Sequence, residues 1–65
     1  MKIQGEYIQL DRFLKKLNWV DSGGVAKFII QDGAIRVNGE VERRRGRKLR
    51  PGDVVTFDGE RAVVE

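Results

Sequence analysis

The sequence predicts an α+β domain in which two short helices pack on a small, mainly antiparallel sheet. Two observations indicate this class. The first half of the chain carries two apolar stripes at helical spacing, and the second half carries short strand-like segments joined by turn dipeptides. Helices followed by antiparallel strands are typical of a sheet covered on one side. Because the chain has only 65 residues, we expect a single domain over residues 1–65.

The first predicted helix follows a loosely alternating segment, residues 1–9, which favours a short strand or an extended arm. Its apolar stripe has the spacing i, i+3, i+4 and i+7 and comprises Leu10, Phe13, Leu14 and Leu17. The opposite helix face is basic and comprises Arg12, Lys15 and Lys16. A charged solvent face is usual for an amphipathic helix. We therefore give this face a binding role only if it adjoins a second basic surface.

The second predicted helix begins after Ser22, a suitable N-cap, and ends at Gly33, which suits the C′ position. Its apolar stripe comprises Val25, Ala26, Ile29 and Ile30. Gly23 and Gly24 in the first turn need an explanation, since each weakens a helix by about 1 kcal/mol relative to alanine. Close approach of the two helices is one explanation, and a bare backbone that binds phosphate is the other. We expect the first.

The second half of the chain predicts two hairpins. Asn38-Gly39 lies between two strand-like segments and favours a type I′ turn, because both of its residues must adopt positive φ. Val54–Phe57, Asp58-Gly59 and residues 61–64 form the second hairpin candidate. Between the hairpins, Pro51-Gly52 fits the central pair of a type II turn.

Residues 43–50 form a basic run between these hairpins. The run contains six positive side chains and no acid: Arg43, Arg44, Arg45, Arg47, Lys48 and Arg50. The whole chain has 13 Lys+Arg and 10 Asp+Glu, so without the run it would hold seven bases against ten acids. One basic patch on a mildly acidic body favours a polyanion, and nucleic acid is the leading candidate. The alternative is a solvated, disordered loop, but the run leads directly into a predicted turn and strand.

Two aromatic residues stand apart from the apolar stripes. Phe28 lies off the centre of the second stripe, and Trp19 lies in the turn between the helices. Either ring could stack on a base. In so small a domain we expect both rings in the core or at its edge, and Lys27 free to face a ligand.

The composition excludes several classes of function. There is no cysteine and no histidine, so disulfides, Cys/His zinc sites and a histidine general base are excluded. The acids are scattered and the hydroxyls have no histidine partner, so we expect no enzyme, no cofactor and no metal. No segment resembles a signal peptide or is long enough to cross a bilayer, which predicts a cytoplasmic protein without a membrane partner.

Four motifs in order resemble a known RNA-binding module. They are Leu10-Asp11-x-Phe13-Leu14, Ser22-x-x-x-Ala26, Ile30-x-x-Gly33-x-Ile35-x-Val37-Asn38-Gly39 and Pro51-Gly52-Asp53-Val54-Val55. This ordered set, which covers nearly the whole chain, is similar to the alpha-L motif of the fourth small-subunit ribosomal protein. The segments 22–27 and 44–49 further resemble the short stand-alone bacterial proteins of the YaaA/YbcJ type.

This resemblance implies a protein that binds structured RNA, ribosomal or tRNA-like. We also expect a monomer. The implied RNA-binding residues are Lys15, Lys16, Ser22, Gly23, Gly24, Lys27, Arg43, Arg44, Arg45, Arg47 and Lys48. Many family members carry an arginine where this chain has Gly23, so Lys27 or the glycine backbone would have to substitute for it. Because A-form RNA hides its base edges in a deep groove, such a surface reads backbone and shape. The alternative is a small adaptor whose basic run binds an acidic protein partner.

Overall fold

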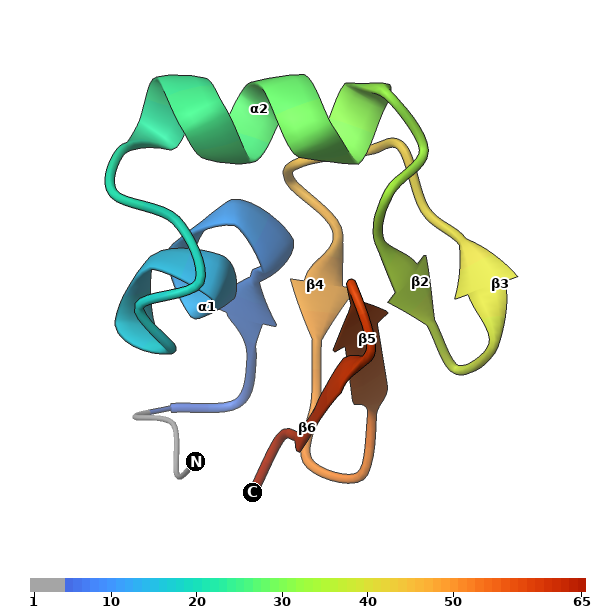
Figure 1. The fold of residues 1–65 in the computed structure, drawn as a ribbon. Helices are drawn as coiled ribbons and strands as arrows, with labels where there is room; N and C mark the ends of the chain where they lie inside the picture. Colours follow the sequence, from blue (N-terminus) through green and yellow to red (C-terminus); the bar gives the residue numbers. More distant parts are fainter. Residues whose placement is uncertain (1–4) are drawn as a thin grey trace.

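The computed structural model describes residues 5–65, which contain two helices and six short strands (Figure 1). The elements are β1 (Ile8–Gln9), α1 (Leu10–Lys16), α2 (Gly23–Gln31), β2 (Arg36–Val37), β3 (Glu40–Val41), β4 (Lys48–Leu49), β5 (Val54–Phe57) and β6 (Glu60–Val63). The predicted α+β class is confirmed. The first four residues of the predicted N-terminal arm lie outside the described residues.

The strands form two antiparallel sheets rather than the single small sheet expected. Four strands pair in the order β3-β2-β5-β6, and β1 pairs separately with β4. In the smaller sheet Ile8 lies opposite Leu49 and Gln9 lies opposite Lys48. The chain between β3 and β4 thus leaves the larger sheet and returns beside the start of α1 (Figure 1).

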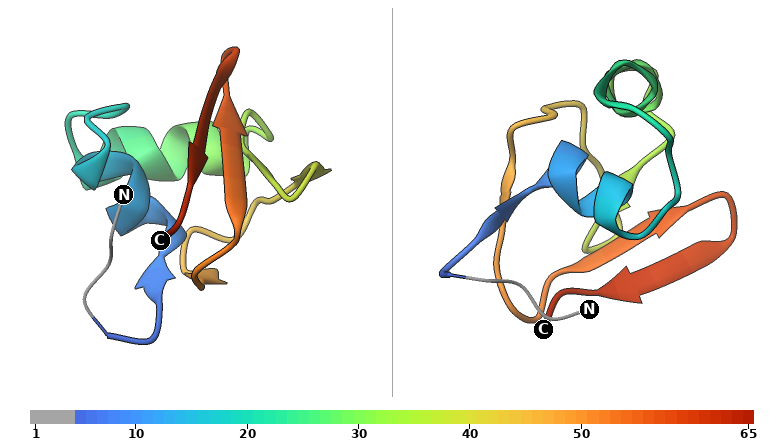
Figure 2. Two further views of the ribbon diagram at one scale, coloured as in Figure 1. Left: turned by 90° about the horizontal axis from the view of Figure 1, so that it is seen from below. Right: turned by 90° about the vertical axis from the view of Figure 1, so that its left-hand side faces the viewer.

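Both helices bury one face in the hydrophobic core. Leu10, Phe13 and Leu14 of α1 are fully buried, as the first apolar stripe predicts, and Leu17 packs at the edge of the core. Figure 2 shows α1 lying between α2 and the hairpin of β5 and β6. The other core side chains are Ile8, Val20, Ala26, Ile30, Ile35, Val37, Leu49, Val55 and Val64.

The second apolar stripe is narrower than expected. Ala26 and Ile30 are buried, whereas Val25 is 46% exposed and its assignment to the core is wrong. The expectation for Phe28 is also wrong, since its side chain is 70% exposed. The residue follows Ala26 by about 200° around the helix axis and therefore points away from the core. Trp19 is half-buried at the core edge, as expected, with its ring centroid 6.2 Å from that of Phe57.

The predicted caps and turns are confirmed. Ser22 Oγ accepts a hydrogen bond from the Val25 N–H at 3.3 Å, which caps α2, and Gly33 follows the helix with φ +83°. Asn38 and Gly39 both have positive φ, as a type I′ turn requires. The Asn38 side chain also accepts from the Val54 N–H and donates to Asp53, so the first hairpin turn is tied to the Pro51-Gly52 turn.

Candidate nucleic-acid interface

Residues 43–50, called the basic loop from here on, are held at their start by a buried acid. Glu42 is only 7% exposed and receives hydrogen bonds from two arginines of the loop. Arg44 donates from Nε, at 3.0 Å, from Nη2 and from its backbone N–H, and Arg47 donates from Nη1 at 2.8 Å. The Arg44 side chain, and to a lesser degree Arg47, lowers the pKa of Glu42 to about 2, although burial opposes this shift.

The basic loop is also docked on the first turn of α1. This helix has no side-chain N-cap. Its first N–H groups instead donate to the loop, from Leu10 to the Arg47 carbonyl at 2.9 Å and from Asp11 to the Arg45 carbonyl at 3.0 Å. The first N–H groups of a helix have no acceptor within the helix, so these bonds stabilise both segments. The alternative of a disordered, solvated loop is wrong.

The six positive charges of the loop are therefore not equivalent. Arg44 and Arg47 are ion-paired with Glu42. The Arg44 side chain is nevertheless 76% exposed, because Glu42 takes only its Nε–Nη2 edge. The side chains of the other four cations are exposed and form no salt bridge within residues 5–65: Arg43, Arg45, Lys48 and Arg50. Of these, Arg50 lies near Asp53, whose Oδ2 accepts its backbone N–H at 2.8 Å.

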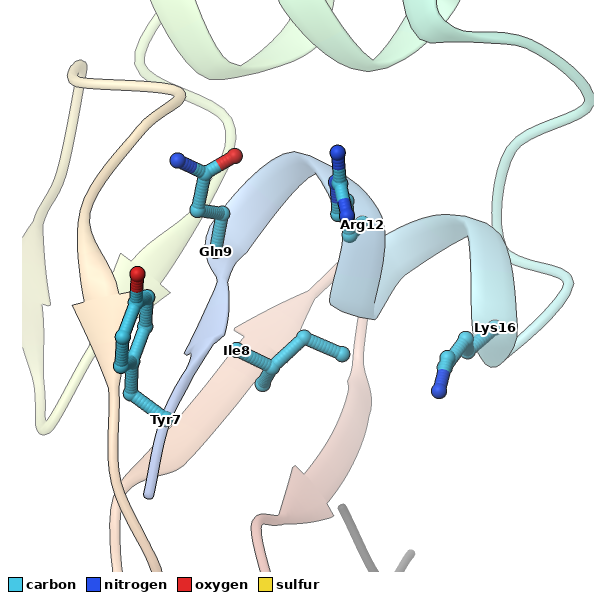
Figure 3. A pocket seen from close by; sticks show the side chains of 5 residues that line it. All are labelled: Tyr7, Ile8, Gln9, Arg12 and Lys16. Carbon is cyan, nitrogen blue, oxygen red and sulfur yellow. The ribbon is translucent and has the colours of Figure 1, made fainter. Parts of the chain in front are cut away.

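The basic face of α1 adjoins the basic loop, which is the condition for giving it a binding role. Tyr7, Gln9, Arg12 and Lys16 border an open groove of about 390 Å³, to which Ile8 also contributes (Figure 3). Lys48 Nζ lies 5.0 Å from the centre of the Tyr7 ring and so joins the loop to this groove. Two further hollows continue the surface. They are lined by Arg44, Gly46, Arg47 and Lys48, and by Arg12, Lys15 and Lys16.

We call this continuous surface the cationic face, defined as the basic loop together with Arg12, Lys15 and Lys16. Its cations come from segments that lie far apart in the sequence, the loop at 43–50 and the helix at 10–16. Pairing of β1 with β4 and the hydrogen bonds to the start of α1 bring these segments together. A surface of this kind can bind a polyanion at several points at once.

The first turn of α2 is a separate feature. A methyl group added at Gly23 would have no heavy atom within 4 Å, and one at Gly24 would meet only Ser22 Oγ at 3.9 Å. Close approach of the two helices therefore does not explain these glycines, and that expectation is wrong. Lys27 is exposed, as predicted. The loop meets α2 at its opposite end, where Arg43 packs so closely on Gly33 that an added methyl group would lie 2.8 Å from its Nη2.

Sequence reasoning missed two residues that shape the face, Glu42 and Tyr7. Glu42 was read only as part of a hairpin strand, although an acid directly before arginines at +2 and +5 is a usable signal for an ion pair. Tyr7 was considered only as an apolar residue of the N-terminal segment and as a hydroxyl without a histidine partner. Among residues 5–65, no group of three or more acidic side chains is placed to hold a metal ion. No helix in this part of the chain is long and apolar enough to cross a membrane.

A small α+β domain with one continuous cationic face is the layout of a nucleic-acid-binding module. The chain belongs to the S4 domain family, whose model matches residues 1–65. It is 44% identical over 59 residues to a Bacillus subtilis (strain 168) protein named "Probable ribosome maturation protein RlbA". That match covers 91% of this chain and 83% of the relative.

Solved structures show the same fold. The solution structure of YbcJ from Escherichia coli, described as revealing an alpha-L motif involved in RNA binding, matches with a TM-score of 0.74 and 32% sequence identity. The match covers 98% of this chain and 82% of YbcJ. An RNA pseudouridine synthase of Aquifex aeolicus (strain VF5) is 39% identical over 54 residues, which are 83% of this chain but only 17% of that protein. The predicted alpha-L resemblance is therefore confirmed.

Proposed function

We propose that this protein binds structured RNA through its cationic face, without catalysing a reaction. The observation that carries the proposal is the joining of the basic loop to the basic face of α1 through Lys48 and Tyr7. This contact turns two stretches of charge into one surface. The family, and the RNA-binding description of the YbcJ structure, support the same function.

The arginines of the loop are suited to phosphate. A guanidinium group presents a planar fork that bonds two phosphate oxygens at once. Glu42 takes the Nε–Nη2 edge of Arg44 and leaves its Nη1 free. An arginine that is already oriented loses less side-chain entropy on binding than a mobile one. Glu42 therefore lowers the net charge of the loop by one but places two of its cations in fixed positions.

The RNA that we favour is ribosomal. The similar Bacillus subtilis protein is named for ribosome maturation, and folded ribosomal RNA offers the closely spaced phosphates that a rigid cationic face can bind. The first turn of α2 would supply a second and weaker contact. There Ser22, Gly23 and Gly24 present backbone N–H groups at a helix start, and Lys27 lies one turn further on. We further propose a monomeric, cytoplasmic protein.

Ultraviolet crosslinking in cells, followed by sequencing of the bound RNA, tests this function. We expect crosslinked reads to be enriched in paired regions of ribosomal RNA. A variant with Arg12→Gln and Arg45→Gln should lose most of that enrichment, because it removes one cation from each half of the face. If protein partners instead survive RNase treatment of a pull-down and no RNA is crosslinked, the loop binds an acidic protein and the proposal is wrong.

A further inference from the structure

The small sheet of β1 and β4 has two chemically different sides. Ile8 and Leu49 lie opposite each other and are buried in the core. Gln9 and Lys48 also lie opposite each other, and because side chains alternate along a strand they point to the other side. Tyr7, two residues before Gln9, shares that side, as its contact with Lys48 shows.

This outer side carries groups that phosphate binding does not require. The Tyr7 side chain is 41% exposed and borders the groove of about 390 Å³ together with the Gln9 amide. A duplex backbone presents charged phosphates and hydroxyl groups, which the surrounding cations can contact and which tyrosine and amide side chains can also contact. An exposed aromatic ring and an amide, with both a donor and an acceptor, also match the flat face and the polar edge of a nucleobase.

Cations surround this aromatic and amide pair on two sides. Lys48 lies over the Tyr7 ring, and Arg12 and Lys16, one helical turn apart, line the groove from α1 (Figure 3). The lysine helps to fix the orientation of the ring through a cation–π contact. The volume of the groove is in the range of small-ligand clefts, about 300–1,000 Å³. One nucleotide could therefore place its base between Tyr7 and Gln9 while its phosphates meet Lys48 and Arg12.

We propose that the groove beside β1 is a subsite for one unpaired nucleotide, whose base stacks on Tyr7 and is contacted by Gln9. This inference rests on the proposed function, since it assigns to the same cationic face a preference within RNA. The target is then a helix interrupted by a bulge or a flipped base rather than a continuous duplex. The basic loop binds the neighbouring phosphates, and the groove binds the unpaired nucleotide.

Two RNA hairpins test the subsite. One has a fully paired stem, and the other has the same stem with one unpaired adenosine. The affinities of the wild-type protein and three variants are measured by fluorescence anisotropy. Tyr7→Leu removes the ring, Tyr7→Phe keeps it, and Phe28→Leu removes a ring from α2 that is more exposed, at 70% against 41% for Tyr7. Thermal melting of each variant establishes that it is folded.

We expect the wild-type protein to bind the bulged hairpin about tenfold more tightly than the paired one, in the range of a single base–aromatic stack. Tyr7→Leu should abolish this preference, so that its affinities for the two hairpins become equal. Tyr7→Phe and Phe28→Leu should keep the preference. Equal binding of both hairpins by wild type, or a preference that survives in Tyr7→Leu, would overturn the subsite and leave RNA binding intact. If neither hairpin is bound at all, the proposed function fails as well.

Discussion

The basic loop and the first turn of α2 are both candidate phosphate-binding segments, but they are built in opposite ways. The loop is fixed by a buried acid, by hydrogen bonds to the start of α1 and by pairing of β4 with β1. The turn at Ser22 to Gly24 has a capping hydroxyl and almost nothing packed against its glycines. The difference shows that a dense run of charge in a sequence is not necessarily a flexible tail. Here part of the charge is used to hold the rest in place.

The largest expected effect separates the structural arginines of the loop from its free ones. Arg44→Gln with Arg47→Gln leaves Glu42 buried without an ionic partner. Leaving the buried Glu42 carboxylate without a compensating charge should lower the free energy of unfolding by about 2–3 kcal/mol. This is less than in a deep core, because Glu42 lies close to the surface. For a domain of this size, this corresponds to a fall of roughly 10 °C or more in the melting temperature.

The matched control is Arg45→Gln with Arg50→Gln, which removes the same charge from the same loop. Neither residue contacts Glu42, so the free energy of unfolding should change by no more than about 0.5 kcal/mol. Thermal or urea denaturation distinguishes the two variants. Equal stability of the two would mean that the ion pairs with Glu42 do not hold the loop.

A second prediction concerns the loss of folding stability at low pH. The pKa of Glu42 is about 2 in the folded protein against an ordinary 4.5, so its ion pairs stabilise the fold fully above pH 4.5. This stabilisation is lost as the pH falls from 4.5 towards 2, because the unfolded chain then binds a proton that the folded protein does not. Between pH 7 and pH 3, the wild-type protein should lose about 1–2 kcal/mol more than Glu42→Gln. Parallel urea titrations at the two pH values measure this, and identical losses would contradict the assignment.

The smallest effect on RNA binding is expected at the first turn of α2. Gly23→Ala with Gly24→Ala should stabilise α2, since alanine is the better helix former and the added methyl groups have room. The gain should be about 1 kcal/mol in total, less than for two helix-interior positions, because both residues lie in the first turn. RNA affinity should fall by about twofold at most, because Cβ atoms crowd a backbone contact that we consider secondary. A loss of stability would restore the idea of close helix packing. A large loss of affinity would make this turn, rather than the loop, the main phosphate site.

Most of the fold follows from local sequence patterns. The buried residues of α1, the Ser22 cap and both hairpin turns depend on spacings and dipeptides within a few residues of each other, and the sequence predicts them correctly. Phe28 was misplaced because its core position was argued from the size of the domain rather than from its angle on the helix. Pairing of β1 with β4 joins segments about forty residues apart, and no local sequence pattern predicts it.

The sequence likewise predicts some features of the candidate site and not others. The charge of the basic loop is plain in the sequence, as is the basic face of α1. Their union depends on the long-range strand pairing, so it could be stated only as a condition. Glu42 was missed because a strand residue next to a basic run looks like an ordinary solvated acid. Its burial is a property of the packed structure.

The salt dependence of RNA binding tests most directly whether the loop and α1 act as one face. The variant Arg12→Gln with Arg45→Gln takes one cation from each segment. The control Arg36→Gln with Arg61→Gln removes the same charge from exposed positions on the four-stranded sheet, both opposite Thr56 in the register. Each phosphate contact contributes about −0.9 to the slope of log K against log salt on a B-form duplex, and a comparable amount is expected here. The account predicts a slope shallower by about two units in the first variant and unchanged in the second. An equal change in both variants, or none in the first, would contradict a single cationic face.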